Sequence, residues 1–98
     1  MKSLVLKNNQ EIKKIIGERI KNYRIQSGYS QSDLAKRSGV SIHTISNIEN
    51  GAEFTLTNLI SILRALNLVD NFDLLVPEVA PNPFDLEKGI VLRQRKRK

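Results

Sequence analysis

Residues 30–51 contain two short helical patterns joined by a tight glycine turn, and they constrain the fold more than any other stretch. Ser30 is predicted to cap the first helix, because a serine oxygen accepts the free amide hydrogens of an opening turn. Asp33 stands three residues later, as in a capping box. Gly39 supplies the backbone freedom that a sharp turn needs, and Val40 is placed to fill the corner. The pattern predicts two helices that meet at an angle near residue 39.

The second helix of this pair has one apolar side and one polar side. Ser41 is predicted to cap it and Gly51 to end it. Its apolar residues, Ile42, Ile45 and Ile48, recur every three positions. The other side is short, polar and mostly uncharged, and comprises His43, Thr44, Ser46, Asn47 and Asn50. Two helices joined by a glycine turn, with a polar outward face on the second, are typical of a helix-turn-helix that reads DNA.

Composition agrees with a small binding domain and disfavours an enzyme. The chain has 98 residues, which is enough for one modest core, and no cysteine for a disulfide or a thiolate zinc site. Stability must therefore come from packing, with dimerisation as a further source. The net charge is +6, but residues 93–98 carry five of the positive charges, so residues 1–92 have a net charge of only +1. A basic surface on the folded part must then arise from geometry.

Four further segments complete the predicted organisation. Residues 2–6 are short, apolar and partly β-branched, and are compatible with a single strand. A first helix is predicted from about residue 9 to residue 27, because isoleucines recur at helical spacing and Gly28 follows. Thr55 is predicted to cap a fourth helix, with a fifth over residues 69–76 that Pro77 ends. The fourth helix has the predicted apolar stripe Leu56, Leu59, Ile60, Leu63 and Leu66, and the fifth turns Phe72, Leu75 and Val76 inward.

The central region resembles the Cro/phage-repressor (Xre) class of bacterial helix-turn-helix domains. The resemblance covers residues 18–66 and is carried by SQ at 30–31, LA at 34–35, GVS at 39–41, IS at 45–46 and IENG at 48–51. It implies an all-α fold of five helices. Around this fold we expect one or two short flanking strands and an extended basic C-terminal tail.

The resemblance also implies which residues contact DNA. The second helix of the motif would lie in the major groove, with Ile42, His43, Thr44 and Asn47 facing base edges. Asn47 has a donor and an acceptor side by side, which suits adenine, and His43 can donate to guanine. Ile42 fits the core and the groove equally well. Phosphate contacts are expected from the start of the preceding helix, from its basic residues and from the polar ends of the reading helix: Gln31, Lys36, Arg37, Ser41 and Asn50.

The other chemical interpretations of these residues are weaker. His43 is the only histidine, so no metal ligand set is predicted, and no cofactor is expected. No nucleophile stands at a recognisable spacing from a base, which argues against catalysis. In the family that the chain resembles, the glutamate matching Glu49 pairs with an arginine of the first helix, which Arg24 matches. The resemblance therefore implies a structural ion pair.

The flanks resemble antitoxins of the Hip type, on the segments NLVDNFDLLVPE and PNPFDLEKGIVLRQRKRK. Such proteins are small dimeric repressors that bind a serine/threonine-kinase-like toxin and repress their own operon. Residues 4–6 or 89–92 would then pair between subunits as a strand. One alternative function is a phage-type or controller regulator without a toxin partner. Another is a protein-interaction module that has lost DNA binding, which the polar face of the second helix of the motif does not support. For residues 77–98, the alternative is a basic tail that adds nonspecific attraction to phosphates.

We expect three segments: an arm or strand over residues 1–8, a DNA-binding domain over 9–76, and a proline-containing segment with a basic tail over 77–98. The expected partners are double-stranded operator DNA, a second copy of the chain and the kinase-like toxin. Neither a signal peptide nor a membrane segment is recognisable, so the expected compartment is the cytoplasm.

Overall fold

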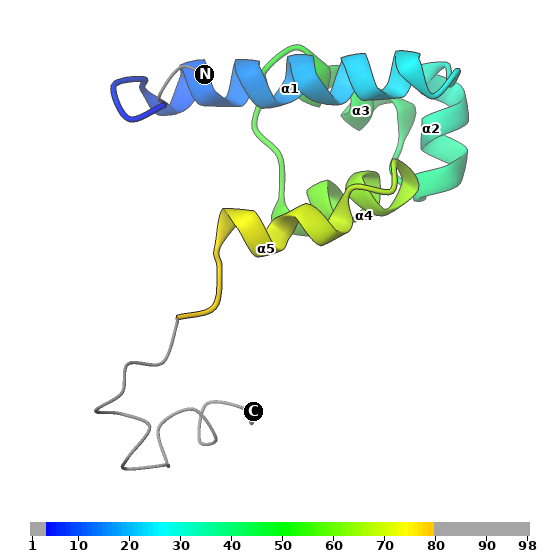
Figure 1. Ribbon diagram of the computed structural model, residues 1–98. Coiled ribbons are helices and arrows are strands. Elements are labelled where there is room, and N and C mark those ends of the chain that lie inside the picture. The colour runs from blue at the N-terminus through cyan, green and yellow to red at the C-terminus, as the bar shows by residue number, and fades with distance from the viewer. Residues whose placement is uncertain (1–3, 80–98) are drawn as a thin grey trace, which may run out of the picture.

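The computed structural model describes residues 4–79, and the expected five-helix, all-α architecture is confirmed there. The elements are α1 (Asn9–Gln26), α2 (Gln31–Ser38), α3 (Ile42–Glu49), α4 (Leu56–Ala65), the single 3-10 turn η1 (Val69–Asn71) and α5 (Phe72–Leu75). In Figure 1, α1 lies along one side of the domain and α4 and α5 along the other, while α2 closes one end. Helix α3 contacts both α1 and α2, and α2 also contacts α4.

The helix boundaries follow from capping residues that the sequence displays. Asn8, Ser30, Ser41 and Thr55 each accept a hydrogen bond from the third residue of the helix that they precede. At Asn8 and Ser30 the capping box is complete, because Glu11 and Asp33 accept from the cap's own backbone amide. Gly39 ends α2 with a φ of 76°, in the left-handed region that side chains with a Cβ atom rarely adopt. The chain can therefore turn sharply between α2 and α3.

The core lies where the four longest helices meet. It contains one aliphatic set from α1 to α4 and the turn residue Val40: Ile20, Leu34, Val40, Ile45, Ile48, Leu59, Ile62 and Leu66. Val40 fills the corner of the turn, as expected, and is 6% exposed. Ile45 and Ile48 are fully buried, which orients the opposite side of α3 toward solvent.

The apolar stripe predicted for α4 was wrong at its first position. Leu56 is 62% exposed, whereas Ile62, which the predicted stripe omitted, is fully buried. Leu59, Ile62 and Leu66 are spaced three and four residues apart, so they form the buried face. Leu56 stands at the first position of α4, next to its cap, where the helix leaves the core.

The fifth helix is shorter than expected, and two of its predicted inward residues are exposed. Residues 69–71 form η1 and only Phe72–Leu75 are α-helical. Phe72 packs against the core, but Leu75 is 66% exposed and Val76 77% exposed. A single α-helical turn has one inward face, and Phe72 occupies it.

The strand expected at residues 4–6 is also wrong for this chain. The Lys7 amide donates to the Leu4 carbonyl oxygen at 3.1 Å, which closes a turn immediately before the Asn8 cap. Among residues 4–79 no strand is present. The second expected strand, residues 89–92, and the basic tail lie outside the described residues.

We predict that Ile62→Ala lowers the free energy of unfolding by about 2–5 kcal/mol, because it leaves a cavity in a fully packed core. Leu56→Ala is the matched control from the same helix, and its effect should stay within about 0.5 kcal/mol. Denaturant unfolding of both variants measures this. An equal loss of unfolding free energy in the two variants would show that Leu56 contributes to the core as much as Ile62 does.

Candidate nucleic-acid interface

The exposed side of α3 presents His43 and Asn47 one helical turn apart. Both side chains are exposed, and Asn47 Nδ2 lies 3.3 Å from His43 Nε2, within hydrogen-bond distance. The two polar groups therefore occupy adjoining positions on the same face. Ile42 also faces outward and is 49% exposed. The sequence fitted Ile42 equally to the core and to the groove, and the structure places it on the surface.

The start of α3 is held by Ser41 and Thr44. The Ser41 hydroxyl accepts from the Thr44 backbone amide at 3.1 Å and donates to the Thr44 hydroxyl at 2.8 Å. Thr44 is half-buried, while Ser41 is exposed. At the other end Asn50 is the exposed C-cap, and its amide donates to the Ser46 and Asn47 carbonyl oxygens. The polar face of α3 is thus bounded by Ser41 and Asn50.

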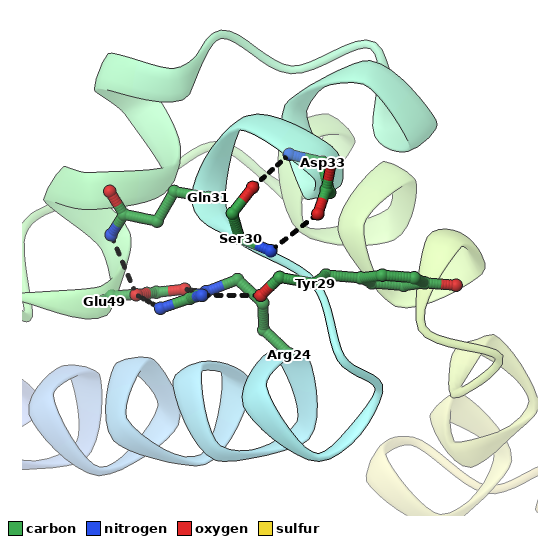
Figure 2. Close-up of polar contacts among 6 residues, drawn as sticks. All are labelled: Arg24, Tyr29, Ser30, Gln31, Asp33 and Glu49. Carbon is green, nitrogen blue, oxygen red and sulfur yellow. Dashed lines mark hydrogen bonds and ion pairs between the residues drawn. The ribbon is translucent and has the colours of Figure 1, made fainter.

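A buried polar cluster lies beneath this surface, where α1, α2 and α3 approach each other (Figure 2). Arg24 of α1 donates from Nε to Glu49 Oε2 at 2.7 Å and from Nη2 to Glu49 Oε1 at 3.2 Å. Its Nη1 donates to the Tyr29 carbonyl oxygen at 2.8 Å, in the loop between α1 and α2. Arg24 and Glu49 are each only 9% exposed. The ion pair implied by the family resemblance is therefore a bidentate, buried contact between α1 and α3.

Gln31, expected to contact a phosphate, extends this cluster. Its Nε2 donates to Glu49 Oε1 at 3.0 Å, so one amide hydrogen is engaged inside the protein. Figure 2 shows the amide oxygen of Gln31 turned away from Glu49. The sequence did not indicate this bond, because the two residues are separated by 18 positions and share no periodic pattern. The phosphate role of Gln31 stays a prediction.

The first turn of α2, which carries Gln31, is stabilised by a carboxylate. Asp33 accepts from the Ser30 backbone amide at 2.9 Å. The hydrogen bonds from the Ser30 backbone, and secondarily from its side chain, lower the pKa of Asp33 below its ordinary value. Because this pKa is lowered on folding, the ionised Asp33 carboxylate stabilises the folded state at neutral pH. This stabilisation is lost as the pH falls through the lowered pKa.

The two basic residues of α2 differ in their contacts. Lys36 and Arg37 are both exposed, but the Arg37 guanidinium lies 4.4 Å from the centre of the Tyr29 ring. This cation–π contact holds Arg37 over the loop between α1 and α2. The sequence did not indicate this contact, because the two residues are eight positions apart, Tyr29 in a loop and Arg37 in a helix.

Helix α1 approaches α3 so closely that only glycine fits at the contact. A Cβ atom added at Gly17 would overlap the carbonyl oxygen of Ile48 and lie 3.1 Å from the Glu49 carbonyl carbon. Gly17 itself is buried. The last turn of α3 is therefore seated directly on the backbone of α1.

We predict that Arg24→Ala or Glu49→Ala lowers the free energy of unfolding by about 3–5 kcal/mol, because each leaves a buried charge without its partner. Arg64→Ala and Glu18→Ala remove exposed side chains of the same types and serve as controls. Thermal and denaturant melts measure the effect. Wild-type melting combined with lost DNA affinity would assign the pair to the binding surface instead.

Comparison with known proteins gives this geometry a family context. A family model described as "Helix-turn-helix" matches residues 20–70. "Antitoxin HipB" of Escherichia coli (strain K12) is 46% identical over 50 residues, which cover 50% of this chain and 57% of that protein. "HTH-type transcriptional regulator SinR" of Bacillus subtilis (strain 168) is 46% identical over 39 residues, or 40% of this chain and 35% of that protein. The chain spans little more than half the length of the HipB proteins that it matches.

Within residues 4–79, no helix combines the length and apolar character needed to cross a membrane. The family match covers the two helices of the motif, the buried Arg24–Glu49 pair and the whole of α4. The chain therefore belongs to the helix-turn-helix family, of the Xre type that its sequence resembles.

Proposed function

We propose that the protein is a transcriptional repressor that reads double-stranded DNA with the exposed face of α3. The single observation that carries this proposal is that the short helix α3 has one fully buried apolar face and one exposed polar face. Ile45 and Ile48 are fully buried, and the opposite face presents His43 and Asn47 as adjoining polar groups. A rigidly seated helix with uncharged hydrogen-bonding side chains is what base readout in the major groove requires.

Each residue of the surface has a role set by its chemistry. Asn47 bonds adenine through its amide, and His43 donates to guanine. Ile42 and the methyl group of Thr44 contact thymine methyl groups. The contacts to phosphate come from residues around this face: Gln31, Lys36, Arg37, Ser41 and Asn50. Gln31 keeps one amide hydrogen and its oxygen for this purpose, since its other bond is to Glu49.

The protein acts as a dimer on a palindromic operator. One helix of eight residues contacts too few bases to select an operator, so two copies with half-sites about 34 Å apart are required. An apolar groove of about 200 Å³ between α1 and the α4–α5 side supports this assignment. It is lined mainly by Ile16, Ile20, Tyr23, Leu59, Leu63, Leu68, Phe72 and Leu75, with Arg19 and Asn71 as its polar lining residues.

The occupant that we assign to this groove is a second copy of the chain. Exposed apolar side chains of the same segment, Leu74, Leu75 and Val76, supply the complementary apolar surface. Arg19 lines the groove, and Asp73 is exposed on the same short helix as Leu75, so this side of the molecule offers both signs of charge to a second copy. The groove includes no residue of α3, which leaves both reading helices open to DNA.

The sharper form of the proposal is an antitoxin that represses its own operon and binds a Hip-type, kinase-like toxin. The relatives named antitoxin HipB support it, as does the resemblance of the segments after residue 66. The alternative is a stand-alone regulator, which the match to a protein named as a transcriptional regulator favours. Co-purification from the native operon separates the two, because only the antitoxin brings down a kinase-like partner. For both forms of the proposal, we assign residues 77–98 to contacts with protein partners or with DNA phosphates.

We predict that His43→Ala and Asn47→Ala each weaken operator binding by about 1–3 kcal/mol without unfolding the domain, because each removes contacts to base edges. Asn22→Ala, which truncates an exposed asparagine of α1, is the matched control. Footprinting and titration on the upstream DNA measure the effect. If the loss were equal on random DNA, or absent, α3 would not be the reading element.

We also predict that Leu75→Glu weakens dimerisation by about tenfold or more, because it places a charge in an apolar contact. Leu56→Glu changes a similarly exposed leucine away from the groove and should leave the dimer intact. Sedimentation equilibrium of both variants decides. If Leu75→Glu dimerises like the wild type, the groove is not the dimer contact.

A further inference from the structure

A polar stripe on the first half of α1 contacts the end of the reading helix. Residues 10, 13, 14 and 17 recur at i, i+3, i+4 and i+7, so they share one face of α1. Three of these four positions precede residue 20, where the family match begins, by a full turn or more. All four engage residues 48–53, which form the last turn of α3 and the loop that follows it.

The individual contacts are specific. Gln10 Nε2 donates to the Gly51 carbonyl oxygen at 3.0 Å in a half-buried bond. The Lys13 ammonium forms an ion pair with the Glu53 carboxylate. A Cβ atom added at Gly51 would lie 2.6 Å from Lys14 Cγ, and one at Gly17 would overlap the Ile48 carbonyl oxygen. We use the name α1 clamp for Gln10, Lys13, Lys14 and Gly17.

The α1 clamp acts on a short helix whose orientation depends on its contacts with the rest of the domain. Helix α3 has only eight residues and no side-chain charge in its last turn other than Glu49, which is bound to Arg24. Two helical turns are unstable alone, so α3 depends on its tertiary contacts: Ile45 and Ile48 seat it on the core, and the contacts at its two ends add to its orientation. Ser41 caps the first end, and the α1 clamp holds the backbone just past the second.

We propose that Gln10 and Lys13 are positioning residues for DNA reading, which set the tilt of α3 by fixing the loop at residues 50–53. This inference rests on the proposed function of α3. The Lys13–Glu53 pair is partly exposed: the Lys13 side chain is 24% exposed and that of Glu53 84%. Such ion pairs contribute little to global stability, so the effect of this pair on the loop can be tested separately from folding. Removing this one should change the loop without unfolding the domain.

The test is a charge exchange with a matched control. Lys13→Glu should weaken binding to the operator by about tenfold, and the double variant Lys13→Glu/Glu53→Lys should restore most of it, as coupled pairs do. The control Lys13→Glu/Glu18→Lys has the same net charge but places the new lysine on an exposed position of α1. It should bind as weakly as Lys13→Glu. Equal rescue by both double variants would mean that only net charge matters, and would overturn the proposal.

A second measurement needs no DNA. Backbone hydrogen exchange of residues 50–53 should accelerate about tenfold or more in Gln10→Ala and Lys13→Glu, while the core amides of Ile45 and Ile48 keep their rates. Unchanged exchange in the loop would overturn the proposal that the α1 clamp fixes residues 50–53. If the loop responds but the wild-type protein selects no operator, the clamp stands as a structural contact and the proposed function fails instead.

Discussion

The buried ion pair between Arg24 and Glu49 is the interaction on which the position of α3 depends. It joins α1 to the last residue of α3, and further bonds bring in Tyr29 before α2 and Gln31 at its start. Each charge is almost fully removed from water, so neither can be left without the other at small cost. The bidentate contact joins α1 to α3, and the bond from Gln31 to Glu49 adds α2, so directional bonds hold the three helices in one relative orientation, which aliphatic packing alone does not specify.

Helix α1 is therefore a frame for α3, the proposed DNA-reading helix, although none of the residues of α1 is assigned to the proposed DNA surface. It contacts α3 through the ion pair at Arg24, through the glycine contact at Gly17 and through Gln10 at the following loop. On its other side it contributes Ile16, Ile20 and Tyr23 to the apolar groove. One helix thus connects the proposed dimer surface with the proposed DNA surface.

The errors in the sequence interpretation have physical causes. Leu56 satisfies a helical period, but so does Ile62, and only packing shows which of the two faces the core. The same reasoning placed Leu75 and Val76 inward, but α5 has four residues and only Phe72 packs against the core. Residues 4–6 have the composition of a strand, yet the hydrogen bond from the Lys7 amide to the Leu4 carbonyl oxygen closes a turn there. Periodicity identifies an apolar side without saying how far the core extends.

The sequence by itself determined the helix caps, the glycine turn at residue 39 and the polar and apolar sides of α3, because these depend on neighbours within a few positions. It also supplied the candidate contact residues and, through resemblance, the pairing of Arg24 with Glu49. Tertiary structure decided that Gln31 bonds Glu49, that Arg37 lies on Tyr29, that Ile42 is exposed and that Gln10 contacts Gly51. These contacts join residues that are distant in sequence or lie on separate elements, so no local pattern records them. They exist only once the hydrophobic core has brought α1, α2 and α3 together.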